Sequence, residues 1–118
     1  MLAHAGMLSS SSEKTNTPVD LAAITDPSID PLTPGGVELL RLVDAVLARS
    51  ADISRVAEEV KTELGPTGLI DAAGVIGNYQ MMNRVADGTG IPVGKGSRLR
   101  NAELINRLGL DRLDHTDG

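Results

Sequence analysis

The sequence predicts an all-α fold, arranged as a helical bundle. Apolar residues recur at helical spacing in several segments, and no segment shows the alternation of apolar and polar residues that marks a half-buried strand. Glycine and proline separate these segments from one another. The chain has 118 residues, of which 41% are apolar, so it can form one modest domain with its own core.

Residues 1–31 are expected to form a partly ordered N-terminal segment. Residues 1–8 have a helical composition, but the serine run Ser9–Ser12 predicts a flexible linker that ends a very short helix. Thr17 and Pro18 suit the N-cap and first position of a second short helix. Prolines beyond it predict an extended loop, because each proline also keeps the preceding residue out of the helical region.

Residues 32–113 are expected to form a helical hairpin domain. A helix from Pro34 to Arg49 is apolar over more than half of its circumference, so it needs covering on two sides. A helix from Asp52 to Leu64 has one narrow apolar stripe, which is typical of a helix at the surface. Gly65 and Pro66 predict its end, since glycine suits the left-handed position after a helix and proline cannot continue it.

The longest predicted helix starts at residue 66 or 67 and continues to about Asp87. Gly74 and Gly77 lie inside it, at a cost of about 1 kcal/mol each relative to alanine, which predicts the close approach of a neighbouring helix. One of its stripes stays apolar throughout, and we expect a second neighbour there. That stripe consists of Ala72, Val75, Tyr79, Met82 and Ala86.

A last helix is predicted after the loose linker at residues 93–96, with Ser97 or Asn101 as its cap. Its apolar residues share one face and indicate packing on a core. They are Leu99, Ala102, Ile105 and Leu108. Residues 114–118 are polar and are expected to form a frayed tail.

The overall charge argues against nucleic acid as a partner. The chain carries 16 acidic and 11 basic residues, and its formal net charge of −5 has the wrong sign for binding a phosphate backbone. Tyr79 is the sole aromatic residue, so almost no surface exists on which bases could stack.

The absence of cysteine limits the chemistry further. It excludes disulfides, thiolate metal sites and cysteine nucleophiles from the chain. The two histidines lie near opposite ends of the sequence and belong to no metal-binding motif. We therefore expect no metal and no cofactor.

Neither a membrane span nor a secretory signal is expected. No apolar run approaches the roughly 18 residues that a membrane-spanning helix needs, and the first residues lack the basic start of a secretory signal. The sequence therefore predicts a soluble cytoplasmic protein without a membrane partner.

Four polar residues of the central helix form a candidate site: Gln80, Asn83, Arg84 and Asp87. Polar side chains that continue an apolar line must be hydrogen-bonded or must face a cavity. In one interpretation they are structural, satisfying loop carbonyls and pairing with an acid across a helix interface. In the other they line a substrate pocket.

The pattern Asn-x-x-x-x-Asn-Arg-x-Ala-Asp before Gly-Ile-Pro, residues 78–92, resembles a signature of the alkyl hydroperoxidase D-like, or carboxymuconolactone decarboxylase, family. The likeness spans most of residues 32–110. It implies an alkyl hydroperoxidase D-like helical bundle and a peroxidase-related, antioxidant protein. Members of that family are homo-oligomers, so the resemblance implies a trimer or hexamer. The second apolar stripe of the central helix independently predicts contact with another subunit.

The segment His4-Ala-Gly-Met-Leu is similar to the residues immediately after the Cys-x-x-Cys motif of the family's redox-active members. There a histidine takes part in a proton relay, and the resemblance places His4 in that catalytic role if cysteines precede it. The resemblance thus implies an incomplete domain that begins just past its dithiol. A shortened gene product, a mis-set start codon or a cysteine-free paralogue would each give such a chain.

Peroxide reduction in this family requires a thiolate and a resolving thiol. Since the chain has neither, we expect a family member that is catalytically silent, with His4 as a helix-terminal residue. The alternative function is a small helical module for protein–protein interaction or oligomerisation.

Overall fold

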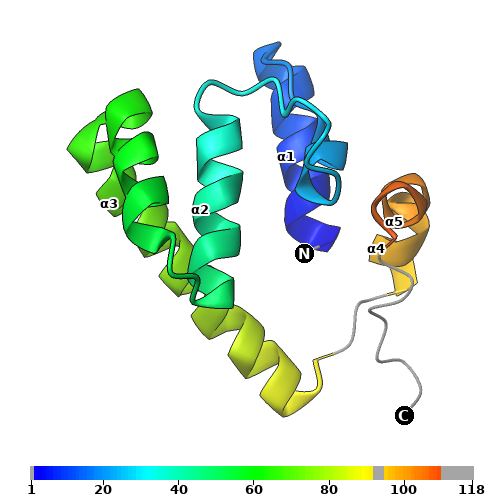
Figure 1. The fold of residues 1–118 in the computed structure, drawn as a ribbon. Helices are drawn as coiled ribbons and strands as arrows, with labels where there is room; N and C mark the ends of the chain where they lie inside the picture. Colours follow the sequence, from blue (N-terminus) through cyan, green and yellow to red (C-terminus); the bar gives the residue numbers. More distant parts are fainter. Residues whose placement is uncertain (1, 92–94, 110–118) are drawn as a thin grey trace. The chain divides into compact units, whose positions relative to one another are not determined.

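The computed structural model describes residues 2–91 and 95–109. It contains helix α1 (Leu2–Thr15), the 3-10 turn η1 (Leu21–Ile24), helix α2 (Gly36–Ala48), helix α3 (Ile53–Thr89), helix α4 (Lys95–Arg100) and helix α5 (Ala102–Leu108) (Figure 1). No strand occurs in these two ranges, and the all-α class is confirmed. The predicted tail at residues 114–118 lies outside the described residues.

Contacts divide the chain into two compact units. One unit comprises Pro34–Gly90, and the other joins the described residues before Pro34 to those after Gly90. The sequence pattern predicts one hairpin domain over residues 32–113. The structure instead groups α4 and α5 with the N-terminal segments, because α5 packs on α1 and on η1.

The unit of residues 34–90 is built from α2 and two segments of α3. Gly65 has φ 79° and ψ 169°, which is not helical, so α3 consists of an N-terminal segment (53–64) and a C-terminal segment (66–89). The chain reverses its direction at this point, and the second segment runs back beside the first (Figure 1). The predicted end of a helix at Gly65 and Pro66 is therefore confirmed.

The core of this unit lies between α2 and α3. Leu42 and Ala45 of α2 and Val56 and Val60 of α3 are buried, and Val60 is completely inaccessible. Partly buried apolar residues surround them, and Leu69, Ala72 and Ile76 come from the C-terminal segment of α3. The predicted stripe of the helix at Asp52–Leu64 thus faces this core.

The C-terminal segment of α3 is longer than the helices that cover it. At 1.5 Å per residue it is roughly 36 Å long, whereas the 13 residues of α2 span roughly 20 Å. Figure 1 shows it continuing beyond the end of α2. Its last turns therefore have no neighbouring helix within this unit.

The two glycines inside this segment do not mark a close helix contact. An added Cβ at Gly74 or at Gly77 would meet no atom within 4 Å among the described residues. The prediction of a tightly packed neighbour at these positions is wrong for the described chain. Both glycines lie on the outer side of the segment, where they carry the cost in helix propensity without a packing contact.

In the other unit, α1 continues through Ser9–Ser12 to Thr15, so the predicted serine linker is wrong. Serine is only moderately less favourable than alanine in a helix, and α1 is held by packing on α5. The Thr15 hydroxyl donates to the Ser11 carbonyl at 2.8 Å. The helix ends where Asn16 takes a positive φ of 50°.

The short helix after α1 begins later than predicted. Its N-cap is Asp20 rather than Thr17, and the Asp20 carboxylate accepts the backbone N–H of Ala22 at 3.0 Å. An aspartate is a strong N-cap residue, so the later start satisfies an otherwise unpaired N–H. Leu21 of this turn packs against Leu108 of α5 in a small second core.

The last predicted helix is divided in two at Asn101, which is the N-cap residue of α5. The apolar residues predicted to share one face are therefore divided between two helices, with Leu99 in α4 and the others in α5. Leu108 is buried, whereas Leu99 of α4 is 81% exposed.

Candidate functional site

His4 lies in α1, and its side chain is outside the described part of the structure. The role in a proton relay that the family resemblance implies therefore stays a prediction.

The predicted polar cluster lies where the C-terminal segment of α3 passes the end of α2. Gln80 is half-buried, and Asn83, Arg84 and Asp87 are exposed. Arg84 Nη2 donates to Gln80 Oε1 at 3.5 Å, a long contact within one helix turn. The apolar residues of this helix give way to polar ones on the turns that α2 does not reach. Three of the four residues therefore lie in no buried helix interface. The substrate-pocket alternative stays a prediction.

An apolar face on the same segment is the main exposed feature of this unit. Three large residues of the second predicted stripe are exposed: Val75 at 55%, Tyr79 at 37% and Met82 at 37%. Ala72 and Ala86 continue the stripe at each end and are half-buried, and Ala72 also packs against the core of α2 and α3. We call these five residues the seam.

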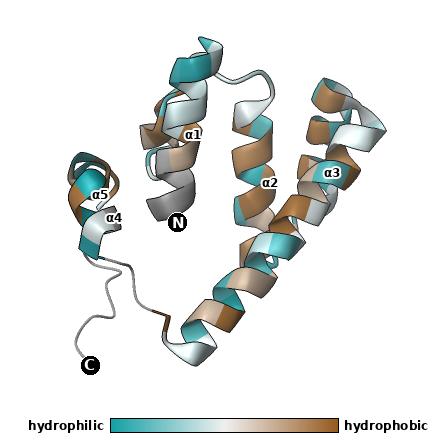
Figure 2. Cartoon of the chain, turned by 180° about the vertical axis from the view of Figure 1, so that it is seen from behind, coloured by the Kyte–Doolittle hydropathy of each residue, from teal (hydrophilic) through white to brown (hydrophobic). Residues whose placement is uncertain are grey.

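The spacing of the seam is that of a coiled-coil interface. Its members alternate at intervals of three and four residues, which is the a and d pattern of a heptad. Figure 2 shows that apolar residues recur along α3 to its last turns. The period of the apolar residues predicts this stripe. The exposed residues Ile70, Met81 and Val85 were not predicted, because they belong to no uninterrupted stripe.

A charged groove of about 610 Å³ lies between α2 and the N-terminal segment of α3. Glu59 is its central residue: Oε1 accepts from Arg55 Nη1 at 2.5 Å, and Oε2 lies 3.5 Å from Arg41 Nη1. A hydrogen bond to Asp52, together with the charges of Glu59 and Asp52, raises the pKa of Arg55 above its usual value. The groove is thus held by its own ion pairs, and its arginines are already engaged.

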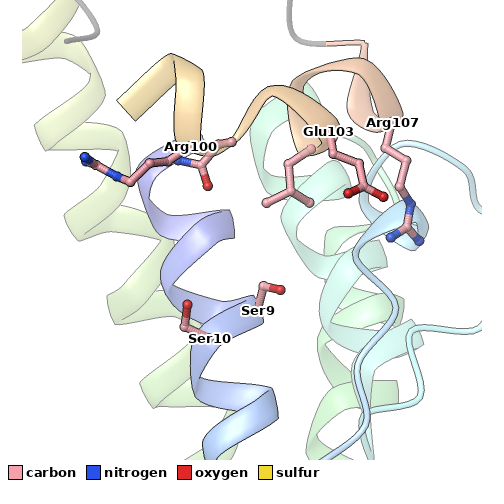
Figure 3. Close-up of a pocket in the computed structure, with 7 residues that line it drawn as sticks. Ser9, Ser10, Arg100, Glu103 and Arg107 are labelled. Carbon is pink, nitrogen blue, oxygen red and sulfur yellow. The ribbon is translucent and has the colours of Figure 1, made fainter. Parts of the chain in front are cut away.

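A polar crevice of about 330 Å³ lies between α1 and α5 in the other unit. Ser9 and Ser10 line it from α1, opposite Glu103 (Figure 3). The side chains of Arg100 and Arg107 point away from each other, and Arg107 is bound to Asp20 at 3.0 Å. The two guanidinium groups therefore do not converge on one anion.

The described residues contain no group of three or more histidine, cysteine or acidic side chains that could hold a metal ion. No helix in the same ranges is both long and apolar enough to cross a membrane. The fold and the exposed seam define a small all-α protein whose most distinctive surface is an apolar helix face. No known protein family matches the chain, and comparison with curated proteins and with solved structures finds no match.

Proposed function

We propose that this chain is a small helical interaction module, and that it acts by associating with a second copy of itself through the seam. The observation that carries the proposal is the exposed line of Val75, Tyr79 and Met82 at heptad spacing. An amphipathic helix with such a line gains stability when a second helix covers it.

The size of the surface fits a weak, reversible contact. Val75, Tyr79, Met82 and the adjoining Val85 together expose the equivalent of about two fully exposed large residues, or roughly 400 Å² at about 200 Å² each. Covered on both copies, this amounts to roughly 800 Å² of apolar surface, which is the low end of the range for protein–protein interfaces.

The position of the seam also favours association. It continues along the turns of α3 that run past α2, where no helix of the same unit lies beside it. A second copy would supply the missing neighbour. Apolar patches of several hundred Å² are uncommon on monomers and often mark interaction sites.

Sedimentation equilibrium of the full chain over a range of concentrations tests the proposal. We expect a reversible dimer. Met82→Lys should weaken it at least about tenfold, because an unpaired ammonium group in the interface costs more than about 1.4 kcal/mol. Leu99→Lys is the matched control: it changes a residue that is 81% exposed in α4 and should leave the dimer unchanged.

A monodisperse monomer at micromolar concentration would contradict the proposal. An equal effect of Met82→Lys and Leu99→Lys would contradict the seam as the interface. Circular dichroism of both variants confirms that helix content is retained, as expected for a residue outside the buried core of α2 and α3.

The family resemblance gives a second candidate function. We propose on that basis a peroxidase-related, antioxidant family member that is silent because it lacks both thiols. The residues that support it are the signature at 78–92, of which Asn83, Arg84 and Asp87 lie exposed on one helix. An assay of organic hydroperoxide consumption with a dithiol donor tests silence, and measurable turnover by the purified chain would overturn it.

A further inference from the structure

The sulfur chemistry of the chain is confined to its methionines. The sequence contains four methionines and no cysteine. Three of the methionines lie in the described residues, and all three are exposed: Met7 at 68%, Met81 at 59% and Met82 at 37%. Peroxides oxidise an accessible thioether to the sulfoxide, which turns an apolar side chain into a polar one. All three side chains are therefore accessible to such an oxidant.

The three methionines differ in their relation to the seam. Met82 belongs to it and lies between Tyr79 and Ala86, about one helical turn from each. Met81 precedes Met82 directly, but successive residues of a helix point about 100° apart, so Met81 lies on a different side of α3. Met7 lies in α1, in the other unit. Of these three, Met82 alone is expected to be covered when two copies associate.

We infer that Met82 is a redox-sensitive modification site, at which oxidation by a hydroperoxide to the sulfoxide separates the two copies. The inference rests on the proposed self-association and adds its regulation. In the reaction the thioether sulfur attacks one peroxide oxygen, an S–O bond forms and the O–O bond breaks. The sulfur loses two electrons. The second peroxide oxygen takes up the proton and leaves as an alcohol, or as water when the oxidant is hydrogen peroxide.

The polarity of the product opposes association. The thioether of methionine is flexible and apolar and fills irregular gaps between side chains, whereas the sulfoxide oxygen accepts hydrogen bonds. Four of the five seam residues carry no hydrogen-bond donor in their side chains. An interface formed by two seams therefore offers the sulfoxide few partners, and an acceptor buried without a donor is unfavourable.

The small size of the contact makes it sensitive to a single oxygen atom. The exposed apolar surface of each copy equals about two large residues, at the low end of the range for protein–protein interfaces. A polar group on one of the few large side chains therefore alters a substantial part of the contact. We expect the dissociation constant to rise at least about tenfold, which corresponds to about 1.4 kcal/mol.

Association should in turn protect Met82 from the oxidant. A thioether that is covered by the second copy is inaccessible to peroxide, so that oxidation proceeds through the separated copies. With peroxide in excess, the rate of sulfoxide formation at Met82 should fall as the concentration of the chain rises. The rate at Met7, which lies outside the seam, should stay constant and serves as the internal control.

Treatment of the full chain with hydrogen peroxide tests the inference, with sedimentation equilibrium for association and peptide mass spectrometry for each sulfoxide. The parent chain should lose its dimer in proportion to oxidation at Met82. Met82→Leu keeps an apolar side chain of similar volume, and its dissociation constant should be the same before and after treatment. Met81→Leu is the matched control: it retains Met82 and should respond as the parent chain does. Methionine sulfoxide reductases with a dithiol should restore the dimer of the oxidised parent chain.

Several outcomes would overturn the inference and leave the self-association in place. One is an equal loss of the dimer in Met82→Leu and in the parent chain, since oxidation elsewhere would then be responsible. Another is a dimer that persists although Met82 is fully converted to the sulfoxide. A third is oxidation of Met82 at a rate that does not depend on chain concentration, because the pair would then not cover it. A monomer before any oxidation would refute the proposed function together with the inference.

Discussion

Asp20 and Arg107 join two parts of the chain that are far apart in sequence. Arg107 Nη2 donates to Asp20 Oδ1 at 3.0 Å, and the same oxygen accepts the backbone N–H of Ala22, also at 3.0 Å. One carboxylate oxygen thus caps η1 and holds α5 against it. The small core of Leu21 and Leu108 lies between the same two elements.

Asp20→Ala should therefore destabilise η1 and loosen α5. Loss of an N-cap typically costs about 1 kcal/mol, and the exposed ion pair adds at most about 1 kcal/mol. Hydrogen exchange at the Ala22 amide is the direct measurement, and it should become roughly five- to thirtyfold faster. Arg107→Gln is the control: it removes the ion pair and keeps the cap, so Ala22 should change less. Equal acceleration in both variants would contradict the capping role of Asp20.

Gly35 is the position where an added methyl group is expected to be most damaging. Its φ is +69°, and a Cβ there would lie 2.7 Å from Leu64 Cδ2. Gly35→Ala therefore combines an unfavourable backbone conformation with a steric conflict at the start of α2. We expect a loss of roughly 1–3 kcal/mol in the free energy of unfolding, measured by urea denaturation.

Gly74→Ala is the matched comparison for Gly35→Ala. Gly74 has a helical backbone, and an added Cβ would meet no described atom within 4 Å. The same substitution should here stabilise the chain by up to about 1 kcal/mol, because alanine is the better helix former. A destabilising effect at Gly74 would indicate a close neighbour at this position.

The sequence predicted the α2 and α3 pair well, because the spacing of apolar residues along each helix indicates which of its faces is buried. Leu42, Val56 and Val60 lie on predicted apolar stripes and form the core. Gly65 and Pro66 marked the reversal because their chemistry forbids a continuous helix. These signals are local, and they need no knowledge of the partner helix.

The predictions that were wrong depended on contacts between distant segments or on relative lengths. Ser9–Ser12 are helical although serine favours loops, because α1 packs on a helix that comes some ninety residues later. The polar cluster at Gln80 was expected on a buried line, and the spacing of residues along α3 cannot show that α2 ends first. The low helix propensity of Gly74 can be read from the sequence, but the open space beside it cannot.

The exposure of Asn83 leads to a prediction that separates the alternatives for the polar cluster. A buried amide that satisfied backbone groups would cost about 1–3 kcal/mol when replaced by leucine. Because Asn83 is exposed, Asn83→Leu should change the free energy of unfolding by less than about 0.5 kcal/mol. Val60→Ala, which truncates the inaccessible core residue, should cost about 2 kcal/mol and shows the sensitivity of the measurement. A loss at Asn83 comparable to that at Val60 would restore the structural interpretation.

The loop after η1 contains a carboxylate whose titration is altered by its neighbour. The Ser28 hydroxyl donates to Asp26 Oδ1 at 2.7 Å, and the Ser28 backbone N–H donates to the same oxygen at 2.9 Å. Both bonds favour the charged carboxylate, and they lower the pKa of Asp26 below its usual value, the hydroxyl contributing most.

The stabilising contribution of this turn should depend on pH in one direction. Since the pKa of Asp26 is lower in the folded chain than in the unfolded chain, the contribution is complete above the unfolded value and is lost as the pH falls through the folded one. An NMR titration of the Asp26 side chain should show the lowered pKa. Ser28→Ala removes the hydroxyl, which is the largest cause, but keeps the backbone bond, so it should raise the pKa of Asp26 part of the way back to its usual value. Titration at the same pH in the parent chain and in Ser28→Ala would contradict the hydroxyl as the main cause.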